Sequence, residues 1–183
     1  DWVQNRIMST LKVSTISPVG TDATKTITIG DLTNGDVAAG AFSNTPSFAV
    51  KITGNQSISN DTDTKVAFDT VVWDTDSAFS TSNYRFTVPT GKGGKYYLQA
   101  HTQIPGIDAN EIGQIMIFIN GSHDQLASVR EQKASADRIF RMITAYTVSL
   151  SAGDYVEIYV YQNSGDAQNA TNQYFTGHRI IGA

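Results

Sequence analysis

Apolar residues occupy every second position in many short segments of this chain. In the segment 155–161, Val156, Ile158 and Val160 alternate with tyrosine and glutamate. A period of two is that of a β-strand that buries one face, because successive side chains point to opposite sides of the sheet. Such segments follow one another from about residue 46 onward, separated by turn residues such as Asn120-Gly121. The pattern predicts an all-β, antiparallel sandwich of about eight to ten strands.

The composition narrows the classes of function. Charged residues make up 16% of the 183 residues, and the formal net charge is -4. Binding to nucleic-acid phosphates requires clustered lysine and arginine, so this acidic balance argues against a nucleic-acid partner. The chain contains no cysteine, which excludes disulfides, thiol catalysis, zinc–thiolate sites and iron–sulfur clusters. No apolar run reaches the ~18 residues of a membrane span, so no membrane insertion is expected.

The first part of the chain differs from the rest. Residues 11–16 and 26–29 alternate as short strands do, but turn residues surround them and few large apolar residues accompany them. We do not expect such a segment to bury a core of its own. The sequence therefore predicts an extended N-terminal arm or stalk over residues 1–43 and a β-sandwich domain over residues 44–183.

Several landmarks of the second part occur in the order of a known family. Residues 84–89 and 94–98 together resemble an F-x-V-P-x-x-G-x-Y element, residues 117–121 resemble a mid-domain hairpin, and residues 148–156 resemble an L-x-x-G-D-x-V turn. The second part thus resembles the trimeric jelly roll shared by the complement-one-q globular head and the tumour-necrosis-factor superfamily. The resemblance implies a jelly-roll sandwich that forms a homotrimer around a threefold axis.

A second resemblance concerns the N-terminal segment. Residues 8–18 and 26–30, together with the segments 65–69 and 175–177, are similar to tail-fibre and appendage proteins of bacteriophages. This resemblance implies a structural protein of the virion, with residues 1–43 attached to other virion proteins of the tail or capsid. The absence of cysteine agrees with assembly in the reducing cytoplasm of a bacterial host.

One strand carries three tyrosines on one side. The alternation in the segment 155–161 directs Tyr155, Tyr159 and Tyr161 away from the buried face. Tyr97 and Phe118 extend a similar outward face on neighbouring strands. Tyrosine combines apolar area with a polar tip and is enriched at protein interfaces. We expect these five residues at the trimer interface; the alternative is an exposed, tyrosine-rich strand with ordinary β propensity.

Polar loops between the predicted strands supply candidate ligand-binding residues, because their amide, hydroxyl and carboxylate groups suit surface glycans. The candidates are Asn60, Asp61, Asp63, Asp74, Asp76, Asn110 and Asn169. The paired hard oxygen ligands of Asp61 and Asp63 also suit calcium. That loop lacks the full spacing of a calcium loop, and aspartate and asparagine are common in turns for conformational reasons. We therefore expect no cofactor and keep calcium at these two residues as the alternative.

No residue pattern indicates an active site. His101, His123 and His178 are scattered, and none stands in a metal or nucleophile motif. Serine and aspartate are so frequent that a Ser–His–Asp arrangement carries no signal. We expect a non-enzymatic homotrimer that attaches to a phage particle through its arm and binds host-surface glycan. Three alternatives stay open: a trimeric capsid decoration or cement protein without a receptor, a secreted complement-one-q-like recognition protein, and, last, a small carbohydrate-active jelly roll.

Overall fold

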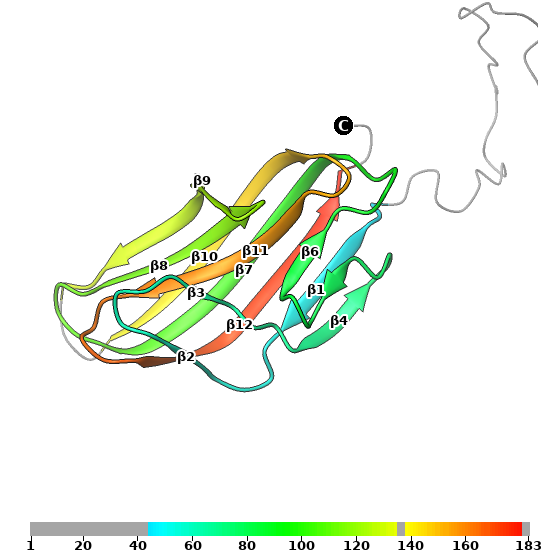
Figure 1. Ribbon diagram of the computed structural model, residues 1–183. Helices are drawn as coiled ribbons and strands as arrows, with labels where there is room; N and C mark the ends of the chain where they lie inside the picture. The colour runs from blue at the N-terminus through cyan, green and yellow to red at the C-terminus, as the bar shows by residue number, and fades with distance from the viewer. Residues whose placement is uncertain (1–43, 135–137, 181–183) are drawn as a thin grey trace, which may run out of the picture. The chain divides into compact units, whose positions relative to one another are not determined.

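The strands expected from the alternation are present in the computed structural model, which describes residues 44–134 and 138–180. The predicted arm over residues 1–43 lies outside the described residues. Within the described part of the chain, no helix is long and apolar enough to cross a membrane. The described residues form twelve β-strands in two antiparallel sheets of six strands each, which confirms the predicted all-β sandwich (Figure 1).

We name the two sheets after their central strands. The β7 sheet contains, in spatial order, β10 (Arg138–Leu150), β7 (Gly94–Ile107), β12 (Gln168–Arg179), β1 (Ser47–Lys51) and β4 (Thr70–Asp74), with β2 (Gln56–Ile58) beside β12. The β11 sheet contains β5 (Phe79–Ser80), β6 (Arg85–Thr87), β11 (Tyr155–Gln162), β8 (Ile112–Ile119) and β9 (Ser122–Gln132), with β3 (Thr64–Lys65) beside β11. From β7 to β12 the chain crosses repeatedly between the two sheets, as in a jelly roll.

The strand count exceeds the expected eight to ten because some strands are very short. β3 and β5 have two residues each and β2 has three. A period of two cannot be recognised in so few residues. β2 and β3 pair with the long strands β12 and β11, and β5 pairs with the three-residue β6 (Arg85–Thr87). These short strands therefore form because of tertiary pairing, a cause that lies outside each segment itself.

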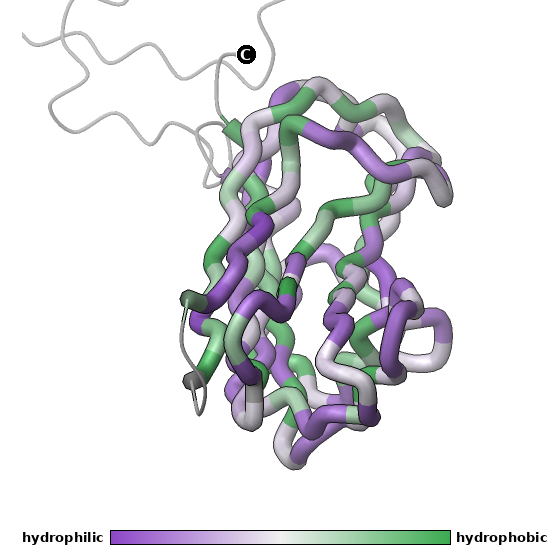
Figure 2. Tube along the Cα trace, turned by 90° about the vertical axis from the view of Figure 1, so that its left-hand side faces the viewer, coloured by the Kyte–Doolittle hydropathy of each residue, from purple (hydrophilic) through white to green (hydrophobic). Residues whose placement is uncertain are grey.

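The core lies between the sheets and follows the predicted alternation. Leu98 and Ala100 of β7 and Ile158 of β11 are at most 1% exposed. The rings of Phe48 and Phe86 stack across the two sheets with centroids 4.5 Å apart. Figure 2 shows hydrophobic and hydrophilic residues alternating along the strands. Each sheet therefore has one buried face and one outer face, and the outer faces are where partners can bind.

The two ends of the sandwich differ in the connections they carry. At one end, the near end, the backbone N–H of Arg179 donates to the carbonyl of Pro46 at 3.0 Å, so the described residues begin and finish side by side. The loops over residues 75–78, 120–121 and 151–154 lie at this end. The opposite end, the far end, carries the loops over residues 59–63, 108–111 and 163–167 (Figure 1).

Candidate functional site

Four of the five residues expected at a trimer interface lie on the outer face of the β11 sheet. Tyr155, Tyr159 and Tyr161 point outward from β11, as the alternation predicts. Phe118 of the adjacent β8 lies beside them, and its ring centroid is 4.1 Å from that of Tyr159. We call these four residues the tyrosine face.

Side chains of the same domain already contact the tyrosine face. The guanidinium of Arg85 lies 4.4 Å from the ring centroid of Tyr155. The hydroxyl of Tyr161 donates to the carboxylate of Asp61 at 2.8 Å. This hydrogen bond raises the pKa of Tyr161, so its hydroxyl remains a protonated donor. The hydroxyl of Tyr161 and the ring of Tyr155 therefore have partners without a second chain.

Charge lies among the tyrosines as well. Glu157 points to the same outer side as Tyr159, yet it is only 6% exposed, and it pairs with Lys65 at 2.5 Å. Burial raises the pKa of the Tyr159 hydroxyl, and the negative charge of Glu157 adds to that rise. A partner that covered the tyrosine face would have to remove the remaining water from Lys65, whose side chain is 28% exposed, and desolvation of a charged group is costly.

The fifth expected residue, Tyr97, lies on the opposite side of the sandwich. It belongs to β7, and its ring centroid is 5.6 Å from that of His178 on β12. The jelly-roll connections place β7 and β11 in different sheets, which alternation within single strands does not reveal. The expectation that all five residues share one surface is therefore corrected.

The outer face of the β7 sheet carries a row of residues without charge. Five residues on five adjacent strands stand in register across it, and we call them the uncharged row: Ala145, Gln99, Thr176, Ala49 and Trp73. Trp73 is 47% exposed, whereas Ala49 is fully buried although it points outward. Sequence reasoning missed this row because its members come from five separate segments and most are small or polar.

The lateral edge of the sandwich also exposes apolar side chains. β9 and β10 are the edge strands of the two sheets and lie next to each other. Leu126 of β9 is 80% exposed, and Ile143 of β10 is 53% exposed. An exposed leucine at an edge is unusual enough to mark a contact surface when other apolar residues accompany it.

Five of the seven candidate ligand-binding residues lie at the far end. They are Asn60, Asp61, Asp63, Asn110 and Asn169. The buried Gln162 holds two of the far-end loops in place. Its Nε2 donates to the carbonyls of Ile58 at 3.1 Å and Asp166 at 2.8 Å, and its Oε1 accepts from the N–H of Ser164 at 2.6 Å. Sequence reasoning missed Gln162, although a glutamine at an inward position of an alternating strand was a usable signal.

The other two candidates, Asp74 and Asp76, lie at the near end, at the opposite end of the sandwich from the first five. Asp74 is paired with Phe48 near the start of β1 and accepts from the N–H of Phe79 at 2.8 Å. Asp76 lies 3.4 Å from Lys92. Both carboxylates organise the turn that links β4 to β5, which is the conformational role that aspartate commonly has in turns.

The residues considered for metal binding and catalysis do not converge. Among the described residues, no group of three or more His, Asp or Glu side chains is placed to hold a metal ion. Asp61 accepts hydrogen bonds from Tyr161 and Asn60, and Asp63 is exposed. His123 stacks on Phe118 with centroids 5.4 Å apart, whereas His101 belongs to the other sheet.

Comparison with known sequences relates the described domain to one family. The family model "C1q domain" matches residues 47–180. The "Phage-like element PBSX protein XkdV" of Bacillus subtilis (strain 168) is 28% identical over 120 residues, which cover 62% of this chain and 17% of that protein. The "Uncharacterized protein YqcC" of the same organism is 31% identical over 116 residues, which cover 62% of this chain and 31% of that protein. The chain thus spans less than a third of the length of these relatives.

Comparison with solved structures gives the same fold. The globular domain of the zebrafish complement 1qA protein superposes with a TM-score of 0.51 at 18% identity, and the match covers 74% of this chain and 97% of that one. At this identity the likeness concerns the fold alone, namely the two-sheet jelly roll described above.

Proposed function

The chain belongs to the C1q domain family, and from this premise we propose that it is a trimeric, non-enzymatic component of a phage or phage-like particle that binds the surface of the host cell. The observation that carries the proposal is the similarity to the phage-like element protein XkdV, which suggests a phage particle. The C1q fold is typically non-enzymatic. In this proposal residues 1–43 attach the domain to other virion proteins.

The family typically trimerises, and the two outer faces are not equally suited to contacts between copies. Interface cores are depleted of charge and closely packed. The Lys65–Glu157 pair lies beside the tyrosine face, whereas the uncharged row crosses five strands of its sheet without a charged side chain. We therefore propose that copies pack through the uncharged row, with Tyr97 as a further contact residue. The tyrosine face and the end of the β7 sheet that carries Lys51 and Tyr174 stay outside the trimer in this proposal.

In a closed threefold ring, one surface of each copy contacts a different surface of the next copy. Each copy therefore needs two contact surfaces. The lateral edge formed by β9 and β10 supplies the second surface. Leu126, at 80% exposure, is the large apolar side chain there that packs on the uncharged row of the next copy in this proposal. The pairing buries apolar area on both sides and leaves the loops of the far end free.

The far end is the proposed side for the host. It lies opposite the near end, where the described residues begin and where the proposed attachment segment joins the domain. Asn60, Asp61 and Asn110 are among the polar side chains there, and such groups suit the hydroxyls of surface glycans. Three copies would present three such ends at once, which converts weak binding of each copy into avidity.

Light scattering on the whole chain at several concentrations tests the trimer. We expect a mass three times the 19.8 kDa of one chain, independent of concentration over the accessible range. A monomer at every concentration would remove both the interface and the avidity argument.

The role in the particle is tested by deleting the gene from a phage or prophage that carries it. The proposal expects intact particles that adsorb poorly to the host. Particles that fall apart but whose surviving fraction adsorbs normally would instead indicate a capsid decoration or cement protein, and the host-binding proposal would be wrong.

A further inference from the structure

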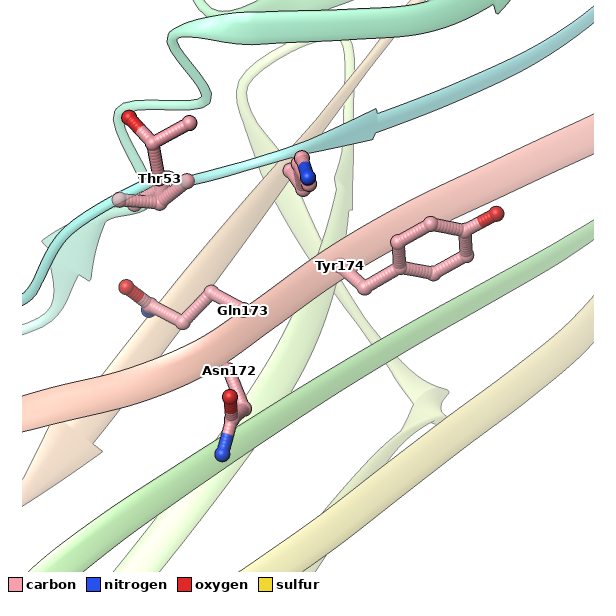
Figure 3. A pocket seen from close by; sticks show the side chains of 6 residues that line it. Thr53, Asn172, Gln173 and Tyr174 are labelled. Carbon is pink, nitrogen blue, oxygen red and sulfur yellow. The ribbon is translucent and has the colours of Figure 1, made fainter.

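A pocket opens beside the end of β1 that is nearest the far end. Its cavity volume is about 410 Å³, which is enough for one sugar residue or a disaccharide. Six residues from two segments line it: Lys51, Ile52, Thr53, Asn172, Gln173 and Tyr174. Figure 3 draws these side chains and labels four of them, with the amide of Gln173 between Thr53 and Asn172. None of the six was among the ligand-binding residues expected from the sequence.

An irregularity in β12 builds one side of this pocket. The pairing of β12 with β7 changes register between Thr171 and Tyr174, and Asn172 between them has a φ of +49°. Asn172 is held by its Nδ2, which donates to Gln103 at 3.0 Å, and by its carbonyl, 2.6 Å from Nδ1 of His101. Bulges and left-handed non-glycine residues of this kind cost stability and occur preferentially beside functional sites.

The side chain of Gln173 is buried in this irregular segment without a partner. It is 2% exposed, and among the described residues neither its Oε1 nor its Nε2 has a hydrogen-bond partner. Gln162 of β11 is equally buried, but both ends of its amide are hydrogen-bonded. An unpaired buried amide is destabilising, so a selected role outside folding is the natural reason to retain one.

The charge and shape of the lining indicate what would bind. Lys51 is exposed, and within the described part of the chain no carboxylate lies within 4 Å of its ammonium. The hydroxyl of Thr53 already donates to Asp69 at 2.9 Å, and Asp69 is not part of the lining. The lining thus combines one free cation, the Gln173 amide and the ring of Tyr174, and it contains no acid.

We propose that this pocket binds one anionic sugar residue of a surface glycan, with Lys51 on the acidic group and Tyr174 against the ring of the sugar. A sugar hydroxyl at the floor of the pocket gives the Gln173 amide the donor and acceptor that the protein does not provide. The ligand class rests on the proposed binding to the host surface, whereas the pocket, the unpaired amide and the free cation stand independently of it. The acidic group is a carboxylate or a phosphate, since Lys51 attracts either.

The whole chain, titrated by NMR with glucuronate, glucose 6-phosphate and glucose, tests the proposal. We expect one or both anionic sugars to shift resonances of the pocket segments, and glucose to bind at least about tenfold more weakly. Lys51→Gln should remove that preference, while Lys95→Gln, a change of the same kind at an exposed lysine of the near end, should keep it. If no sugar shifts these resonances, or if Lys51→Gln leaves the preference intact, the proposal is wrong.

A matched pair of glutamine variants tests the unpaired amide. Gln173→Leu should abolish sugar binding and leave the melting temperature equal or higher, because it removes a buried polar group without a partner. Gln162→Leu should lower the melting temperature, because it leaves the groups around it without partners. If Gln173→Leu lowers the melting temperature as much as Gln162→Leu does, or dissociates the trimer, the amide has a structural partner and the proposal falls.

Binding to intact host cells separates this proposal from the proposed function. If the wild-type chain and Lys51→Gln bind cells equally well, the pocket is not the receptor site and only the pocket proposal is overturned. If the wild-type chain does not bind host cells although it binds the anionic sugars, the pocket proposal stands and the host-binding function is wrong.

Discussion

Gly177 of β12 has no room for a side chain. A Cβ at this position would lie 2.8 Å from Cδ2 of Leu98 and 2.9 Å from Cε1 of Phe48, both of which are fully buried. Gly177→Ala therefore overpacks the core, and we expect a loss of about 1–3 kcal/mol in the free energy of unfolding. Urea unfolding measures it. Gly54→Ala is the control, since nothing lies within 4 Å of its Cβ, and equal losses in both variants would contradict the explanation.

Because of Tyr96, the free energy of unfolding of the domain should fall as the pH rises in the alkaline range. Burial raises its pKa from 10.0 to about 12, and its hydroxyl donates to the carbonyl of Lys92 at 2.6 Å. As the pH rises, the unfolded chain loses this proton before the folded chain does. The stabilisation by the protonated Tyr96 hydroxyl is therefore complete below pH 10 and is lost as the pH rises toward 12. The expected loss is about 2–3 kcal/mol in the free energy of unfolding.

The comparison with Tyr96→Phe isolates this contribution. The variant lacks the hydrogen bond to Lys92 and should be less stable than the wild type at pH 8. Urea unfolding between pH 8 and 11.5 measures the difference in the free energy of unfolding between the wild type and the variant. This difference should shrink as the pH rises, because phenylalanine has no proton to lose. A gap of constant size would show that Tyr96 does not titrate as described.

At the scale of single residues, the sequence predicted which side chains are buried. It did not predict which buried polar side chains have hydrogen-bond partners. Val156, Ile158 and Val160 are buried as the alternation requires. The difference between Gln162 and Gln173 could not be predicted. Both are glutamines of long strands, and their hydrogen bonds depend on loops that only the folded chain brings near.

At the scale of elements, the two outer faces make opposite predictions for substitution by lysine. Ala145 is exposed at the end of the uncharged row, and Ala145→Lys would place an ammonium in the proposed interface. We expect the trimer to dissociate about a hundredfold more readily, since an unpaired charge in an interface costs several kcal/mol. Tyr159→Lys on the tyrosine face should leave the trimer mass unchanged.

Light scattering across a dilution series of both variants decides between the faces. Dissociation of Tyr159→Lys with an intact Ala145→Lys trimer would restore the tyrosine face as the interface. Thermal unfolding of each variant serves as the control, because Tyr159 packs on Phe118 and its loss can weaken the fold itself. The exposed Ala145 has no such role, so its variant should unfold near the wild-type temperature.

The sequence predicted the long strands and left their pairing open. β7, β8, β11 and β12 each have eight or more residues, which is long enough for a period of two to be recognised. The division of strands between the two sheets depends on long-range crossings, for which a period of two carries no information. That is why Tyr97 was grouped with residues that lie on the other side of the molecule.

At the scale of the whole molecule, the proposed trimer should bind cells by avidity. With three far ends presented together, the whole wild-type chain should bind host cells about 10²–10⁴ times more tightly than the dissociated Ala145→Lys variant. Flow cytometry with labelled protein measures the difference. The titration of each with free sugar serves as the control and should give equal affinities, because a single pocket does not depend on valence. Equal binding to cells would contradict the avidity argument.

The adjacency of the first and last described segments has a consequence for how such a domain can be moved between proteins. Pro46 and Arg179 are hydrogen-bonded neighbours at the near end. A surface loop of another protein could therefore accept this domain as an insertion, because the two points at which the chains join would lie close together. Insertion of this kind leaves the loops of the far end unchanged. The domain is therefore suited to transfer between larger polypeptides as one folded unit that keeps the loops of its far end exposed.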